Sequence, residues 1–302
     1  MNSKNKIFVS IMGGIGDQIF QYSFATYLRK RLNCEGYLDT CYYKNKKNFN
    51  NFIFHLNDLA LKNNFIVDNK VSYFDYDKIS YFRFIENYKI NKFLPIIYKF
   101  IFRWPIKRFV YNYWKNKKLK YVLEKDSYYF GYWQNFKYVK NIKKDLNKNL
   151  LNVELKKHKL KKFSKKINKR TIAIHIRGGD FKILSSHNIL ETSYYKNAVK
   201  FYKKLLKNPK FHIYTNDIKL SKKIILNILK KHEITFIKNY KFSDIEEFSL
   251  YSKYKYAIIA NSTFSLMSSY LSLTRKLSIA PKIWLRGERL DKKKQFENLK
   301  FI

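Results

Sequence analysis

The second half of the chain alternates short apolar runs with amphipathic stretches, and this alternation constrains the fold more than any other feature. The apolar runs have the length and the β-branched composition of buried strands; they cover residues 171–176, 211–215, 234–237, 256–260 and 277–281. Helical spacing fills the intervals, at residues 193–206, 219–230, 244–254 and 265–273. Strands that alternate with helices predict a doubly wound α/β domain with a parallel sheet.

The N-terminus begins with the same kind of unit. An apolar run at 7–11 precedes the loop GGIGD, and residues 18–32 have helical spacing with basic residues at the end. Residues 42–139 have weak periodicity, from which we expect a helix over 93–114 and a strand over 127–132. Because a Lys-rich helical stretch covers 143–169, we place a boundary near Lys165 and expect two domains, 1–165 and 166–302.

The chain is strongly basic, with 63 Lys and Arg against 22 Asp and Glu and a formal charge of +41. Such a charge favours anionic partners, namely nucleotide phosphates, nucleic acid or an acidic membrane. Lys, Asn, Ile, Tyr and Phe all have A/T-rich codons, so nucleotide bias explains the same excess and the charge does not choose among these partners. The basic residues are spread along the chain without a nucleic-acid motif, so we expect no nucleic-acid partner.

The expected location is the cytoplasm. The chain has only 2 Cys, which does not make a disulfide framework and fits a reducing compartment. The N-terminal sequence lacks the apolar region and cleavage site of a signal peptide. No run of about 18 apolar residues predicts a transmembrane helix.

Polar residues follow the strand predicted at 171–176. His175 lies at its end, and Arg177, Gly179 and Asp180 lie in the loop RGGDF. The planar guanidinium of Arg can pair with two phosphate oxygens, and consecutive glycines let the backbone approach an anion. The alternative is an Arg–Asp pair that stabilises a turn, with His175 in the core.

Two more polar loops follow predicted strands. Asn216 and Asp217 come after 211–215, where a carboxylate could accept two N–H groups of guanine or simply cap the next helix. After 256–260 the chain continues with Asn261, Ser262, Thr263 and Phe264. Hydroxyls and helix N-terminal amides there could bind an anion or form an ordinary N-cap. Because the carboxyl ends of parallel strands share one edge, we expect all three loops to converge on one crevice.

The order of these motifs resembles the bacterial inverting α-1,2-fucosyltransferases. The resemblance rests on GGIGDQIFQYSFATYL, GYWQNFKYV, HIRGGDF, SYYKNAV, YTND, IIANSTFSLMSSYL and IAPKIW. It implies a GT-B-like fold, in which two Rossmann-like domains face a cleft, and GDP-fucose as donor. The expected reaction moves L-fucose to a hydroxyl of a surface-glycan precursor, such as the 2-OH of a galactoside, as in O-antigen biosynthesis. The first domain would bind the acceptor and the second the GDP-sugar.

The resemblance also implies roles for residues of the second half. Arg177 would contact the β-phosphate, His175 and Asp217 would lie near guanine and ribose, and Ser262 with Thr263 would hold the pyrophosphate. The expected GDP-fucose site also includes Gly179, Asp180, Asn216, Asn261 and Phe264. The chain departs from the family pattern at Gly178, where a second Arg is common, and at Phe181, Asp17, Leu266 and Met267, where Tyr, Asn and paired Trp are common. We therefore expect donor binding to be retained, with a lysine in place of the missing Arg, while acceptor preference stays open.

The expected chemistry needs no metal cofactor. Departure of GDP puts negative charge on the β-phosphate, which the Arg177 guanidinium and helix N-terminal amides would neutralise. The one DxD, Asp75-Tyr76-Asp77, follows no clear strand and is not expected to bind metal.

Inversion needs a base for the acceptor hydroxyl, and Asp17 is the leading candidate. It lies in the loop after 7–11, in which Gly13, Gly14, Gly16 and Gln18 are expected to line the cleft. The alternative is that Asp17 caps a helix beginning at Gln18. Asp180 is the next candidate for the base.

Two other enzyme classes are not supported by the sequence. The spacing of zinc hydrolases is absent among His55, His158, His187, His212 and His232, and GGIG lacks the third glycine of a nicotinamide site. Residues 93–115 interleave aromatics with Lys and Arg, which fits either peripheral contact with an anionic membrane that carries a lipid-linked oligosaccharide acceptor, or a core helix with a basic face. The alternatives for function are transfer from another GDP-sugar and a basic nucleic-acid-binding module.

Overall fold

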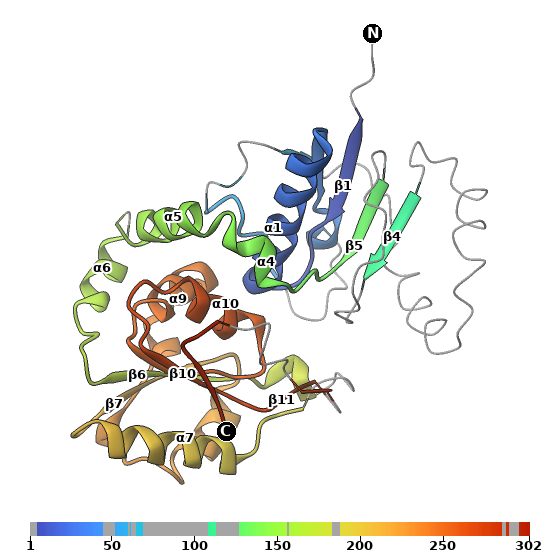
Figure 1. Cartoon of the computed structure of the whole chain (residues 1–302). Coiled ribbons are helices and arrows are strands. Elements are labelled where there is room, and N and C mark those ends of the chain that lie inside the picture. Colours follow the sequence, from blue (N-terminus) through green and yellow to red (C-terminus); the bar gives the residue numbers. More distant parts are fainter. Residues whose placement is uncertain are drawn as a thin grey trace. The chain divides into compact units, whose positions relative to one another are not determined.

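The computed structural model describes residues 5–44, 52–59, 61, 65–68, 108–112, 127–155, 157–182, 188–285, 288–289 and 296–302. The chain divides into two compact units, Met1–Ile142 and Lys143–Ile302. Each unit has its own parallel sheet with helices packed on it (Figure 1).

The first unit is built on a five-stranded sheet of order β3-β2-β1-β5-β4. All four pairings between neighbouring strands are parallel. In chain order the described elements are β1 (Lys6–Ser10), α1 (Ile15–Leu32), β2 (Glu35–Asp39), the 3-10 helix η1 (Cys41–Tyr43), β3 (Ile66–Asp68), β4 (Arg108–Asn112), β5 (Ser127–Gly131) and α4 (Phe136–Lys140). The sheet therefore has β1 at its centre, between β2 and β5, and the loops after β1 and β5 lie side by side at one edge.

Helix α1 is the main helix of the first unit, and its sequence accounts for both of its ends. It begins after Gly14 and ends at Asn33, whose left-handed backbone closes the last turn. An acidic side chain in the first turn and three basic ones in the last turn match the helix dipole. On its buried face, Phe24 stacks on Trp133 with ring centroids 3.9 Å apart, which joins the helix to the loop after β5.

The second unit has a six-stranded sheet of order β13-β10-β9-β6-β7-β8, again with every neighbouring pair parallel. Its strands are β6 (Thr171–Ile176), β7 (Lys210–Thr215), β8 (Ile234–Phe236), β9 (Tyr256–Ile258), β10 (Leu277–Ala280) and β13 (Leu299–Phe301). Its helices are α5 (Lys143–Leu155), α6 (His158–Ser164), α7 (Thr192–Leu205), α8 (Ile218–Ile225), α9 (Asp244–Tyr251) and α10 (Thr263–Leu271). Short 3-10 helices η3 (Gly179–Lys182), η4 (Lys231–Glu233) and η5 (Ile237–Tyr240) and a hairpin of β11 (Ile283–Leu285) and β12 (Glu288–Arg289) complete it. The strand order is that of a doubly wound Rossmann sheet, as the alternating pattern of the sequence predicts.

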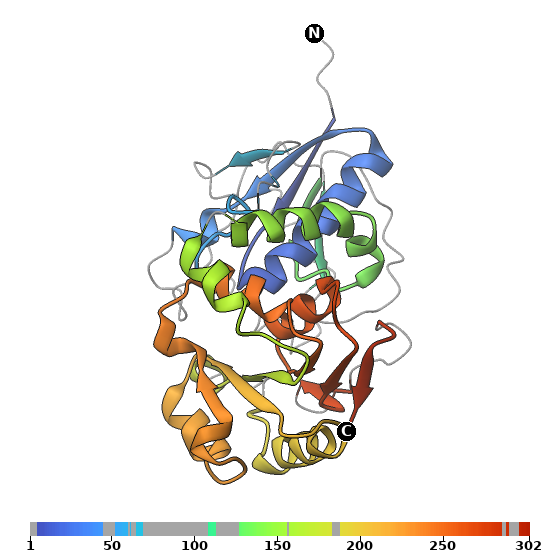
Figure 2. The same cartoon turned by 90° about the vertical axis from the view of Figure 1, so that its left-hand side faces the viewer.

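The two faces of this sheet bury different side chains. Ile172, Ile174 and Ile176 alternate along β6 and pack in the apolar core with residues of α7 and α8. The intervening His175 faces the other way, toward the ring of Tyr251 in α9. Figures 1 and 2 show helices on both faces of the sheet, so β6 is covered on both sides.

Two expectations about the middle of the chain differ from the structure. The helix expected over 93–114 is wrong at 108–112, where β4 pairs with β5 as an edge strand. Alternation of aromatic and basic residues fits a strand as well as a helix over so short a stretch. The remainder of 93–115, like the DxD at 75–77, lies outside the described residues. The boundary expected near Lys165 falls inside the second unit, because α5 contacts α9 and Ser249 donates a hydrogen bond to the carbonyl of Leu150.

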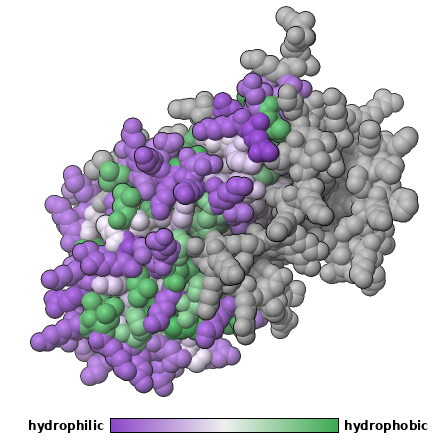
Figure 3. All heavy atoms as spheres, viewed as in Figure 1, coloured by the Kyte–Doolittle hydropathy of each residue, from purple (hydrophilic) through white to green (hydrophobic). Residues whose placement is uncertain are grey.

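The described surface is mainly hydrophilic on the face that Figure 3 presents, with smaller apolar groups between the polar side chains. Within the described ranges, no helix has the length and apolar character required to cross a membrane.

Candidate functional site

The second unit has its topological switch point between β6 and β9. From β6 the sheet extends through β7 to β8 in one direction and through β9 to β10 and β13 in the other. In open α/β sheets, ligands bind where the loops after two such strands diverge, at the carboxyl ends. The loops at this point begin at Arg177 and at Ile259. Of the site residues expected from the sequence, they contain Arg177, Gly179, Asp180, Asn261 and Ser262.

The loop after β6 is held against the loop after β7. The amide of Gly178 donates to Asn216 Oδ1 at 3.0 Å, and that of Gly179 makes a longer contact of 3.5 Å with Asp217 Oδ2. A Cβ on Gly178 would lie 2.8 Å from the Asp217 Cβ and 2.7 Å from Leu220 Cδ2. Gly179 has a φ of +52°, which favours glycine. The two glycines are thus required by the packing of one loop on the other, a reason that the sequence alone did not reveal.

Asp217 is engaged within the second unit. It caps α8, with its Oδ1 accepting from the amide of Leu220 at 3.0 Å, and its Oδ2 lies 2.5 Å from Lys182 Nζ. The hydrogen bond from Leu220 and then the Lys182 ammonium lower the pKa of this carboxyl. Of the two roles weighed from the sequence, the structure shows the helix cap, and a contact of Asp217 with a nucleotide stays a prediction.

His175 and Arg177 are two residues apart, on either side of the end of β6. The His175 imidazole is buried, its centroid lies 5.2 Å from that of Phe264, and its Nδ1 has no hydrogen-bond partner among the described residues. Burial, followed by the Arg177 charge, lowers the pKa of His175 to about 3, so the ring is neutral at physiological pH. The guanidinium of Arg177 is half-buried and lies 5.4 Å from the centroid of the Phe181 ring. Asp180 belongs to η3.

The loop after β9 leads into α10. Asn261 ties it down, donating to the carbonyls of Asn188 at 2.9 Å and Trp284 at 3.1 Å. Ser262 is the N-cap of α10, and its side chain makes no capping hydrogen bond. Thr263 begins the helix, and the first amides of a helix have no acceptor within it. The contact of Phe264 with His175 brings this helix start close to the end of β6, as expected from the sequence.

Glu247 of α9 is a candidate that the sequence analysis missed. Its side chain is buried, and its Oε1 has no partner among the residues that the structure describes. Burial raises the pKa of Glu247 to about 8, with Lys238 opposing and Asp244 adding to the rise. The pKa of Tyr214, near the end of β7, is raised chiefly by burial and then by Tyr254, with a smaller contribution from Glu247. The signal in the sequence was helical spacing, because Glu247 is four residues before the buried Tyr251.

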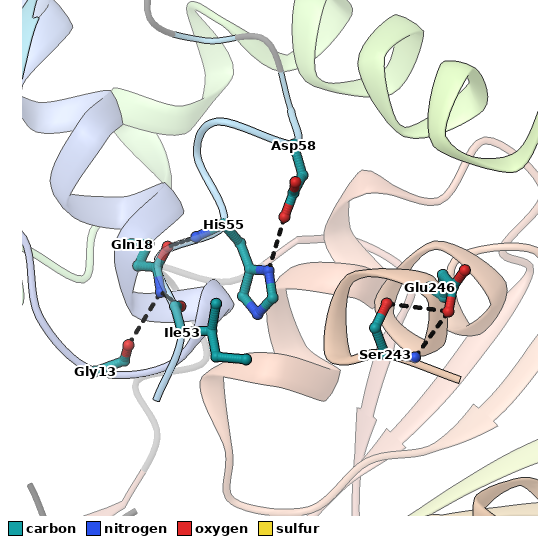
Figure 4. A network of polar contacts seen from close by, with 7 residues as sticks. All are labelled: Gly13, Gln18, Ile53, His55, Asp58, Ser243 and Glu246. Atoms are coloured by element: carbon teal, nitrogen blue, oxygen red, sulfur yellow. Dashed lines mark hydrogen bonds and ion pairs between the residues drawn. The ribbon is translucent and has the colours of Figure 1, made fainter. Parts of the chain in front are cut away.

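The first unit has its own switch point between β1 and β5. Gly13 follows β1 with a φ of +77°, and Gly14 is the N-cap of α1. Buried Gln18 organises this loop: its Nε2 donates to the carbonyls of Gly13 at 3.1 Å and Ile53 at 2.8 Å, while its Oε1 accepts from the amide of His55 at 2.8 Å (Figure 4). Gln18 therefore links the loop after β1 to the segment that contains Ile53 and His55.

Asp17 does not cap a helix beginning at Gln18. Helix α1 begins at Ile15, so both Gly16 and Asp17 lie in its first turn. Asp17 Oδ1 accepts from Gln134 Nε2 at 3.0 Å, and a Cβ on Gly13 would lie 3.1 Å from Asp17 Oδ2. The capping alternative is therefore wrong, because the glycines GGIG themselves form the start of the helix. Asp17 joins the loops after β1 and β5, the edge at which it was expected.

His55 and Asp58 form a pair that was not expected from the sequence, and Gln18 ties it to the loop after β1. His55 Nδ1 lies 3.1 Å from Asp58 Oδ2 (Figure 4). The imidazole is buried, and its Nε2 has no hydrogen-bond partner within the described ranges. The sequence HLND contains this pair, but nothing in a weakly periodic stretch identifies a buried histidine.

No group of three or more His, Cys, Asp or Glu side chains that could hold a metal ion occurs among the residues the structure describes.

Comparisons with known proteins agree with this arrangement. The sequence model of the family described as Glycosyl transferase family 11 matches residues 6–300. An alpha-1,2-colitosyltransferase of Escherichia coli is 27% identical over 289 residues, covering 93% of this chain and 93% of that protein. The O-antigen biosynthesis glycosyltransferase WbnK of Escherichia coli is 26% identical over 301 residues, covering 93% of this chain and 96% of that protein.

A solved structure has the same fold. The fucosyltransferase NodZ from Bradyrhizobium superposes with a TM-score of 0.50 at 11% identity, covering 92% of this chain and 94% of that chain. At this identity the likeness concerns the fold alone, and it confirms the GT-B-like α/β architecture with two parallel sheets.

Proposed function

Because the chain belongs to glycosyl transferase family 11, we propose that it transfers L-fucose from GDP-fucose to a hydroxyl group, with inversion at the sugar. The proposed acceptor is the 2-OH of a galactoside in a surface-glycan precursor. The names of two relatives, an alpha-1,2-colitosyltransferase and an O-antigen biosynthesis glycosyltransferase, support a 1,2-linkage and an O-antigen acceptor.

The observation that carries the proposal is that the end of β6, which Arg177 follows directly, lies against the start of α10 at a switch point. A guanidinium and a helix N-terminus each attract an anion, and here the His175–Phe264 contact brings their two loops together. A diphosphate is the anion that fits both, because its charge is divided over two groups. The proposed donor site thus uses Arg177, Ser262 and Thr263.

The same groups would lower the barrier of the reaction. When the bond between the sugar C1 and the phosphate oxygen breaks, the electron pair stays on the β-phosphate. A fixed guanidinium stabilises this charge more than it stabilises the bound donor, which is what acceleration requires. Arg177 is therefore the proposed catalytic residue of the second unit, and no metal cofactor is part of the mechanism.

We propose that Glu247 and His175 recognise the guanine of the nucleotide. A carboxylate can accept the two N–H groups on the edge of guanine, which uracil and cytosine do not present in the same pattern. Glu247 is buried, and its Oε1 has no partner within the described ranges, whereas both oxygens of Asp217 already accept from Leu220 and Lys182. An Asp217 contact with the ribose remains part of the proposal and would require release of Lys182.

Lys182 is the proposed replacement for the second Arg that relatives carry at position 178. It lies in η3, in the same loop as Arg177, and its side chain is half exposed. An Arg at 178 would not fit, because even a Cβ there meets Asp217 and Leu220. A diphosphate would compete with Asp217 for the Lys182 ammonium. Gly179, Asp180, Asn216, Asn261 and Phe264 complete the proposed donor site.

The first unit is proposed to bind the acceptor. Its loop after β1, with Gly13, Gly14 and Gly16, presents backbone groups to a sugar, and Asp17 supplies a carboxylate for a sugar hydroxyl. Asp17 is the base expected from the sequence. The proposed acceptor is a lipid-linked oligosaccharide at the cytoplasmic face of the membrane, with the basic surface in peripheral contact with anionic lipids.

One comparison suggests an alternative donor. The alpha-1,2-colitosyltransferase matches 93% of this chain. Colitose differs from fucose in lacking the 3-hydroxyl, so a site that fits one sugar fits the other except at that position. GDP-colitose is therefore the alternative donor.

The first experiment measures donor class and turnover. GDP should raise the melting temperature more than UDP or CMP does, and transfer from GDP-fucose should exceed transfer from GDP-colitose and GDP-mannose. Turnover should persist in excess EDTA. Arg177→Ala should lower kcat by about 100-fold or more, while Arg170→Ala, which removes an exposed positive charge before β6, should not. Equal stabilisation by all nucleotides, or full turnover of Arg177→Ala, would contradict the proposal.

A further inference from the structure

We propose that His55, oriented by Asp58, takes the proton from the acceptor hydroxyl. This inference rests on the proposed function and identifies the base of that reaction within the first unit. It moves the role of base from Asp17, the candidate expected from the sequence, to a histidine that the sequence analysis had considered only as a metal ligand.

The contact with Asp58 determines which nitrogen of His55 is basic. The Asp58 carboxylate accepts a hydrogen bond, so the proton of the neutral ring lies on Nδ1, 3.1 Å from Asp58 Oδ2. Nε2 then carries a lone pair and can accept a proton. When it does, the positive charge of the imidazolium lies beside the Asp58 carboxylate, which stabilises it.

His55 Nε2 is a buried nitrogen whose hydrogen-bonding capacity is unmet within the described residues. The residue is only 4% exposed, and this nitrogen has no hydrogen-bond partner among the described residues. A buried polar atom without a partner is unfavourable and calls for an explanation, and a role in binding or catalysis is one such explanation. In Figure 4 the imidazole presents Nε2 on the side away from Asp58. A sugar hydroxyl, which donates one hydrogen bond, is the chemical group that this atom lacks.

The position of His55 is set by the acceptor-side loop. The His55 amide donates to Gln18 Oε1 at 2.8 Å. Gln18 in turn donates through Nε2 to the carbonyl of Gly13 at 3.1 Å. Through Gln18, the backbone of His55 is tied to the loop that follows β1, and ligands of an open sheet bind at such strand ends. A base held from its backbone and its ring has little freedom to lose when the acceptor binds.

Asp17 is less suited to receive the proton. Its Oδ1 already accepts a hydrogen bond from Gln134 Nε2 at 3.0 Å, in the first turn of α1. That contact occupies one of the two carboxylate oxygens and holds the side chain against the loop after β5. In the proposed reaction Asp17 orients the acceptor and His55 deprotonates it.

The step balances as follows. The acceptor O–H bond breaks and its proton moves to His55 Nε2, while the oxygen forms a bond to C1 of the donor sugar. The bond from C1 to the phosphate oxygen breaks, and its electron pair leaves with GDP. The imidazolium then returns its proton to water.

The test separates proton transfer from folding and from donor binding. His55→Gln should lower kcat by about 10²–10⁴-fold, with the KM for acceptor and the stabilisation by GDP close to those of the wild type. The matched control is His212→Gln, because His212 is also buried and bonded through Nδ1, to the Tyr254 hydroxyl at 2.7 Å, in the second unit. Turnover of this control should stay within a few-fold of wild type.

Chemical rescue supplies a readout that a structural role would not move. In His55→Ala the lost imidazole leaves space, so added imidazole should restore transfer, whereas it should not restore Arg177→Ala. Asp58→Asn should lower kcat less than His55→Gln does, because Asp58 only positions the ring. Wild-type turnover in His55→Gln, or failure of imidazole to rescue a folded His55→Ala, would overturn the inference. Failure of the proposed function is distinct, since the wild type itself would then show no GDP stabilisation and no sugar transfer.

Discussion

Replacing Glu247 by Gln tests whether a neutral carboxyl is buried in α9 of the second unit. Burial raises the pKa of Glu247 in the folded chain to about 8, from an ordinary value of 4.5. Above its ordinary value the unfolded chain loses this proton, while the folded chain keeps it up to about pH 8. The folded state then binds more protons, so the free energy of unfolding falls as pH rises.

The magnitude follows from the two pKa values. At about 1.4 kcal/mol for each tenfold change in proton affinity, the stabilisation present below the ordinary pKa and lost by pH 8 is about 5 kcal/mol. Between about pH 5 and pH 8 the wild type should lose about 4 kcal/mol relative to Glu247→Gln, which has no proton to release. Near pH 5 the two chains should be similar in stability, because Gln has the shape of the protonated carboxyl.

The assay is urea unfolding of both chains, followed by tryptophan fluorescence at about one-unit steps from pH 5 to pH 8. The difference between the chains removes the contribution of all other titrating groups. A difference that stays constant across this range would refute the reasoning, since it would mean that Glu247 is ionised in the folded chain.

The same variant tests the role of Glu247 in recognising guanine. A carboxyl that is neutral in the free protein must ionise to accept the two N–H groups of the base. GDP binding near pH 7 should therefore release close to one proton in the wild type and none in Glu247→Gln. Calorimetry in buffers of different ionisation enthalpy measures this number. Binding without proton release in the wild type would remove the proposed contact with guanine and leave the burial argument intact.

Two further predictions concern the loops. Gly178→Ala should lower the free energy of unfolding by about 1–3 kcal/mol, because the added Cβ meets the Asp217 Cβ at 2.8 Å and Leu220 Cδ2 at 2.7 Å; a loss below about 0.5 kcal/mol in urea unfolding would mean that the two loops separate easily. Gln18→Leu should lower the free energy of unfolding by about 3 kcal/mol, since it leaves the carbonyls of Gly13 and Ile53 and the amide of His55 without this partner. Gln18→Glu keeps the acceptor oxygen for the His55 amide and is the milder comparison in the same assay.

Local pattern was enough to predict five strands of the second sheet, whereas the sixth, β13, was not expected. Strands such as β6 and β7 are short apolar runs between amphipathic helices, and each was expected within a residue or two of where it lies. Their sequential placement then gives parallel pairing, because a helix between two strands returns the chain to the same end of the sheet. The first unit was less predictable, since β4 at Arg108–Asn112 reads equally as part of a basic aromatic helix.

The loops of the candidate site were predictable in position and only partly in role. Arg177 and Ser262 were expected at the carboxyl ends of β6 and β9, and they lie there. The partners of Asp217 could not be deduced, because Lys182 and the crowding of Gly178 come from another loop. Hydrogen bonds between loops depend on how closely two strands and their helices pack, which no single segment encodes.

The sequence by itself determined that this chain alternates strands with helices, that polar loops follow its parallel strands, and that these motifs resemble a family of sugar transferases. Only the tertiary structure decided which polar groups of the described residues are buried without a partner, among them Nε2 of His55 and Oε1 of Glu247. The physical reason is that strand and helix patterns depend on neighbours along the chain. The burial of a titratable group and its hydrogen-bond partners depend instead on residues that folding brings from elsewhere.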